Sequence, residues 1–84
     1  MITAYQVFKG DTDKHDRQIW ELLGTYLNKD KAEERADKIV SDTELRGDNL
    51  IDEGWAKNDL YRIWMAHGWD YIGICKINKI EITE

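Results

Sequence analysis

The sequence predicts a small α+β protein, in which an antiparallel sheet of three or four strands carries one or two helices on one face. Residues at both ends of the chain alternate between apolar and polar types, as strands do. Between them lies a segment whose apolar residues recur at the spacing of a helix. A chain of 84 residues and 9.9 kDa is large enough for one small domain, which we place at residues 1–84.

The first part of the chain predicts a β-hairpin. Residues 2–9 and 18–27 both alternate in the manner of strands, and a polar loop at residues 10–17 separates them. Apolar side chains occur on both faces of this hairpin. Because helices packed on one side cover only one face, we expect a loop, a second copy of the chain or a partner protein to cover the other.

A helix is predicted over residues 29–43. Asn28 is a suitable N-cap residue, and Leu27 before it is typical of a hydrophobic staple. One helical face then collects Ala32, Ala36, Ile39, Val40 and Thr43.

The following stretch has two interpretations. The helical spacing recurs at Ala56, Leu60, Ile63, Trp64 and His67. This pattern predicts a second helix from Asp52 to His67 that ends before Gly68. Residues 60–65 are also rich in β-forming side chains, so the alternative is a strand there, followed by a turn at residues 66–70. The element order is then β-β-α-α-β or β-β-α-β-β.

The last strand is predicted over residues 71–83. Ile72 and Ile74 share one face, and Ile80 and Ile82 share one face, whereas Ile77 is out of phase with both pairs. A β-bulge near residues 76–79 would reconcile these phases.

Composition excludes several classes of protein. The net charge of −5 argues against direct binding to nucleic acid or to an anionic membrane. No apolar run approaches the roughly 20 residues that a membrane-spanning helix needs. A single cysteine forms no internal disulfide, so a cytoplasmic location is the simplest expectation.

Motifs for catalysis or for metal and cofactor binding are weak. Cys75 lies in an apolar strand, which predicts a small core residue. Neither Cys75 nor the two histidines follow the spacing of metal ligands. The acidic residues at 11, 13 and 16 depart from the pattern of a calcium loop. The tripeptide at residues 46–48 is an Arg-Gly-Asp sequence too short to indicate adhesion. We therefore expect no enzyme activity, no cofactor and no metal.

Acidic residues are concentrated between residues 42 and 59. One interpretation is a solvated loop and the start of a helix, where carboxylates suit the helix dipole. The other is an acidic patch that meets a basic partner protein, with tryptophan and tyrosine as its desolvated centre. On this second interpretation the partner-binding residues are Asp48, Asp52, Glu53, Trp55, Asp59, Tyr61 and Trp69.

The N-terminal half resembles a class of short phage and prophage accessory proteins. In these, a hairpin ending in a Gly–x–Tyr/Phe segment runs into a helix that opens with Lys-Ala-Glu-Glu. The matching residues here are Gly24, Tyr26, Lys31, Ala32, Glu33 and Glu34, and residues 77–84 resemble their terminal strand, rich in isoleucine and glutamate.

This resemblance implies a small acidic protein without enzyme activity in the host cytoplasm. It implies an inhibitor or modulator of a host nucleic-acid enzyme, such as a CRISPR effector. The alternatives are a homo-oligomeric accessory protein with no inhibitory role and, less favoured, a minimal enzyme that uses Cys75 or a histidine.

Overall fold

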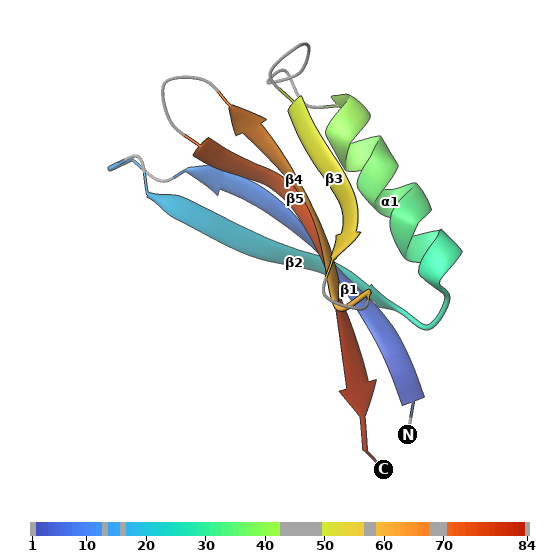
Figure 1. The fold of residues 1–84 in the computed structure, drawn as a ribbon. Coiled ribbons are helices and arrows are strands. Elements are labelled where there is room, and N and C mark those ends of the chain that lie inside the picture. The colour runs from blue at the N-terminus through green and yellow to red at the C-terminus, as the bar shows by residue number, and fades with distance from the viewer. Residues whose placement is uncertain are drawn as a thin grey trace.

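The computed structural model of the chain describes residues 2–12, 14–15, 17–42, 50–56, 59–67 and 71–83. Five strands form one antiparallel sheet in the spatial order β2-β1-β5-β4-β3, and α1 packs on one face of it (Figure 1). In chain order the elements are β1 (Ile2–Thr12), β2 (Gln18–Tyr26), α1 (Lys29–Asp42), β3 (Leu50–Ala56), β4 (Tyr61–His67) and β5 (Tyr71–Ile82). The coarse α+β prediction is therefore confirmed, with more strands than expected.

The hairpin and the first helix form where the sequence places them. β1 runs on to Thr12, which is further than predicted, and β2 ends at Tyr26. Asn28 caps α1, since its side-chain oxygen accepts hydrogen bonds from the backbone N–H groups of Asp30 at 2.8 Å and Lys31 at 3.3 Å. The predicted last residue of this helix, Thr43, lies outside the described residues.

The second helix predicted over residues 52–67 is wrong, because β3 and β4 occupy this stretch. The alternative strand at residues 60–65 corresponds closely to β4, whereas β3 was not predicted at all. The turn between the two strands contains Asp59 in a left-handed conformation, with φ of 64°. The helical spacing is a coincidence of sequence. Ala56 ends β3, whereas Ile63, Trp64 and His67 belong to β4, and the chain reverses direction between the two strands.

A β-bulge in β5 brings Ile77 to the same face as Ile72 and Ile74, although it does not lie where it was predicted, and Ile80 and Ile82 lie on the other face. Against β4, Cys75 is opposite Trp64 while Gly73 is opposite Met65, so Ile74 is the extra residue. The pairing of β5 with β1 runs without interruption through residues 76–79, where we had expected the bulge. The bulge lets Ile74 and Cys75, although adjacent in the chain, both join the core.

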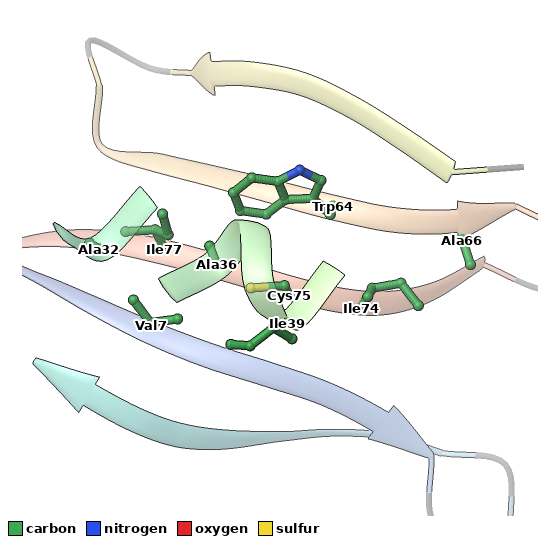
Figure 2. Packing of buried hydrophobic residues seen from close by; sticks show 9 residues of the cluster. All are labelled: Val7, Ala32, Ala36, Ile39, Trp64, Ala66, Ile74, Cys75 and Ile77. Carbon is green, nitrogen blue, oxygen red and sulfur yellow. The ribbon is translucent and has the colours of Figure 1, made fainter. Parts of the chain in front are cut away.

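The core lies between α1 and the sheet (Figure 2). Two alanines of α1 are fully buried, and their small side chains let the helix approach the strands closely. The buried cluster comprises Val7, Ala32, Ala36, Ile39, Trp64, Ala66, Ile74, Cys75 and Ile77. Among the described ranges, no helix is long and apolar enough to cross a membrane.

Cys75 is part of this core, as the sequence predicts. Its side chain is fully buried, and this burial raises the pKa of the thiol to about 12. The thiolate, which is the nucleophilic form, is therefore disfavoured in the folded protein.

We expect the thiol of Cys75 to react with a thiol reagent much more slowly in the folded protein than in denaturant. The substitution Cys75→Ser should preserve the fold and lower the free energy of unfolding by about 1–3 kcal/mol, because it buries a hydroxyl in an apolar site. Labelling kinetics followed by mass spectrometry, together with urea unfolding, test both statements. Rapid labelling of the fully folded chain would contradict them.

Candidate functional site

The two faces of the sheet differ sharply. Residues paired across neighbouring strands share a face, so Phe8 lies on the same side as Leu22 on β2 and Lys76 on β5. The same pairing continues from Lys76 to Ile63 on β4. This side is opposite the one that α1 covers, and we call it the helix-free face, defined by Phe8, Trp20, Leu22, Ile51, Ile63, Met65 and Lys76.

Lys76 lies near the middle of the helix-free face, on the central strand β5. Its ammonium group is 5.0 Å from the ring centroid of Phe8 and 4.4 Å from that of Trp20. Among strand residues with described side chains, it is the only charged one that the register places on this face. Two aromatic rings thus hold a cation on an otherwise uncharged surface by cation–π attraction.

Two glycines allow Trp20 to adopt this position. A Cβ atom on Gly73 would collide with the Trp20 ring, and one on Gly10 would collide with the Gly73 carbonyl. The ring of Trp20 therefore extends from β2 across Gly10 and rests on the backbone of β5 at Gly73.

Gln18 binds the same point of β5. Its side-chain oxygen accepts a hydrogen bond from the Gly73 N–H at 2.6 Å. Its side-chain nitrogen donates to the carbonyls of Gly73 at 3.2 Å and Asp11 at 3.1 Å. Because these contacts connect β2 directly to β5, they keep the aromatic end of the helix-free face in one arrangement.

The predicted acidic patch is partly neutralised within the chain. Arg62 on β4 binds both carboxylate oxygens of Asp52, at 2.7 Å and 3.2 Å, and also contacts Glu33 of α1 at 2.9 Å. The guanidinium lies 4.5 Å from the ring centroid of Trp64. The hydrogen bonds from Arg62 lower the pKa of Asp52, and those to Asp52 raise the pKa of Arg62.

Trp55 and Asp59 meet at Lys29, the first residue of α1. The Lys29 ammonium lies 4.6 Å from the Trp55 ring centroid and 3.8 Å from a carboxylate oxygen of Asp59. Trp55 also packs edge-on against Tyr5, with ring centroids 6.0 Å apart. Its indole nitrogen is buried without a hydrogen-bond partner among the described residues.

The structure therefore divides the predicted partner-binding residues. Asp52, Trp55 and Asp59 lie on the side of the sheet that contacts α1. Tyr61 is paired with Asn78 and lies on the side of the helix-free face. Asp48 and Trp69 lie outside the described residues, as does the side chain of Glu53.

Sequence reasoning missed the cluster of Phe8, Trp20 and Lys76. The excess of apolar side chains on both faces of the hairpin was the available signal, and it did indicate an exposed sheet face. Nothing in the sequence placed Lys76 between the two rings, because that contact depends on the strand order and the register.

A groove of about 620 Å³ opens on the opposite side of the sheet, where the end of α1 lies over β1 and β2. Its apolar floor includes Leu23, Ile39, Ile72 and Ile74. Charged residues of both signs, among them Lys9, Glu21 and Arg35, form its margin.

Metal-binding clusters are not found in the part of the chain that the structure describes: no group of three His, Cys, Asp or Glu side chains converges there. The chain matches no protein-family model, no curated protein and no solved structure.

We expect the pair of Asp52 and Arg62 to stabilise the protein in a pH-dependent manner. Because the folded-state pKa of Asp52 lies below its ordinary value of 3.8, its contribution is present above that pH and is lost as the pH falls. The difference in unfolding free energy between wild type and Asp52→Asn should thus shrink on acidification. Urea unfolding over a range of acidic pH values measures this difference.

The control for this prediction is the same substitution in an Arg62→Met background. With the guanidinium absent, Asp52→Asn should change the acid dependence little. An equal effect of Asp52→Asn in both backgrounds would contradict the role assigned to the pair.

The packing of Trp20 on Gly73 is tested by a double-mutant cycle. Gly73→Ala should lower the free energy of unfolding by about 1–3 kcal/mol, because the added methyl group displaces the indole. The same change in a Trp20→Ala background should have a much smaller effect, since the colliding ring is absent. Urea unfolding of the four proteins measures the coupling, and strictly additive effects would show that the ring does not rest on Gly73.

Proposed function

We propose that the protein acts by binding another protein through its helix-free face. The observation that carries this proposal is the apolar and aromatic surface that α1 leaves uncovered, with one cation at its centre. Of the seven residues that define this face, Leu22 is 48% exposed and the other six are half-buried. An apolar sheet face that is only partly shielded from water is typical of an interaction site. Tryptophan is also one of the residues that contribute most binding energy in protein interfaces.

The chemistry of the face restricts the partner. An apolar surface of this kind favours a partner with apolar side chains, and Lys76 needs a carboxylate or carbonyl acceptor opposite it when water is excluded. Two copies packed face to face would bring two Lys76 side chains together at the centre, because β5 is the middle strand. This like-charge contact favours a different protein as the occupant.

The acidic residues contribute to the proposal through their long-range field rather than through contacts. Asp52 and Asp59 are already paired with Arg62 and Lys29. The net charge of −5 nevertheless attracts a partner with a basic surface and speeds the encounter.

In its biological setting, we propose an accessory protein of a phage or other mobile element that inhibits or modulates a host nucleic-acid enzyme, such as a CRISPR effector. The support for this setting is the resemblance of the hairpin and the start of α1, together with small size and acidity. A homo-oligomeric accessory protein without inhibitory activity is the second candidate, favoured by the exposed apolar side chains of Ile19 and Leu22 on the edge strand β2.

The experiment compares two charge reversals on one strand. Lys76→Glu changes the centre of the helix-free face, whereas Lys79→Glu makes the same change in net charge on the other side of β5. Proteins captured from host lysate by the wild type are identified, and their binding is then measured with each variant. We expect Lys76→Glu to weaken binding at least about tenfold and Lys79→Glu to change it less than about threefold.

Inhibition is tested separately, by adding the wild type and both variants to the captured enzyme in a nuclease or binding assay. Equal loss of binding for the two variants would assign the effect to net charge. Unchanged binding by a folded Lys76→Glu protein would remove the helix-free face from the contact.

A further inference from the structure

The two edges of the sheet are built differently. β3, at one edge, has a break in register between Asp52 and Trp55, where Gly54 adopts φ of 75°. Two adjacent acidic residues, Asp52 and Glu53, occur in the same strand. A bulge and charged residues are the features by which proteins prevent an edge strand from pairing with another chain.

β2, at the other edge, lacks this protection over its first half. Residues 18–22 pair with β1 one residue for one residue, and the register shifts only beyond Leu22. These five residues include no proline and a single charged residue, Glu21, in a chain of which 35% is charged. In Figure 1, β2 forms one border of the sheet and β3 forms the other.

Side chains of this edge are apolar and exposed on both faces of the sheet. Ile19 is 48% exposed on the side of α1, and Leu22 is 48% exposed on the helix-free face. An edge strand with apolar side chains on both sides and free backbone groups provides hydrogen bonds and buried area for one more strand.

We infer that β2 pairs in antiparallel fashion with β2 of a second copy of this chain, so that two sheets join into one. A strand that pairs with its own copy about a two-fold axis is automatically self-complementary. Pairing centred on Trp20 places Glu21 of each copy opposite Ile19 of the other, which keeps the two carboxylates from facing each other. Glu21 also lies opposite Lys9 in its own sheet.

Charge favours this edge over the other surfaces for a second copy. Each chain carries a net charge of −5, so two copies repel one another wherever acidic residues approach. The β3 edge would bring its carboxylates together, and the helix-free face would bring two Lys76 side chains together. The first half of β2 avoids both contacts, and its pairing leaves each helix-free face available.

Sedimentation equilibrium over micromolar to millimolar concentrations tests the inference. The wild type should move from a 9.9 kDa species toward twice that mass as concentration rises. Ile19→Glu should raise the dimer dissociation constant at least tenfold, because it places a carboxylate opposite Glu21 of the other copy on each side of the two-fold axis. The matched control is Leu60→Glu, since Leu60 is 54% exposed in the turn before β4, away from β2.

Hydrogen exchange identifies the surface that mediates association. Amides in residues 18–22 that do not bond to β1 should exchange more slowly as concentration rises, whereas those of β3 should not. A monomer at every concentration would overturn the inference. So would a dimer that Ile19→Glu leaves intact, and Lys76→Glu would then show whether the helix-free face forms it.

The inferred pairing of β2 with a second copy does not depend on the proposed function. Loss of the dimer with partner binding retained in Ile19→Glu supports the edge and leaves the helix-free face as the site for the partner. If Lys76→Glu leaves partner binding unchanged, the proposed function fails, and the inferred pairing of β2 with a second copy is unaffected.

Discussion

In the part of the chain that the structure describes, a single helix lies over a five-stranded sheet and covers one face only, and most features of this molecule follow from that constraint. α1 provides the buried Ala32, Ala36 and Ile39, and the strands direct a compact set of side chains toward them. The bulge at Ile74 increases that set, because it brings two consecutive residues to the same side. The core is thereby concentrated under α1, and a second set of aromatic and aliphatic side chains, which includes Phe8, Trp20 and Ile63, lies on the opposite side.

That opposite side is organised and not merely exposed. The indole of Trp20 rests on the backbone of β5 at Gly73, and the side-chain amide of Gln18 forms hydrogen bonds with the same residue. The ammonium group of Lys76 lies near the rings of Phe8 and Trp20. A surface fixed by packing before a partner arrives loses less side-chain freedom on binding. Cys75, next to Lys76 in the chain, points to the core and contributes packing with a protonated thiol. Adjacent residues of one strand thus belong to the core and to the helix-free face separately.

The sequence was informative where local patterns act alone. The hairpin, the Asn28 cap and the span of the first helix follow from alternation, capping chemistry and helical spacing. The second helix predicted over residues 52–67 is wrong, because apolar residues on both sides of a chain reversal happened to match one helical stripe. The alternative strand at residues 60–65 corresponds to β4, whereas β3 was not predicted. The sequence also could not show that Arg62 neutralises Asp52, or that Lys76 meets Trp20, since both contacts join strands whose pairing is set by the whole sheet. The exposed second face was foreseeable, because a hairpin with apolar residues on both sides cannot bury them all under one helix.

The uncovered face is tested most directly by solvent paramagnetic relaxation of methyl groups in the isolated protein. A soluble nitroxide broadens methyl signals in proportion to their accessibility. The account predicts strong broadening for the methyl groups of Ile63 and Met65 on the helix-free face. It predicts little broadening for Ile74 and Ile77, which are 4% and 0% exposed beneath α1. Equal protection of all four residues would show that the second face is covered within the chain and would contradict the account.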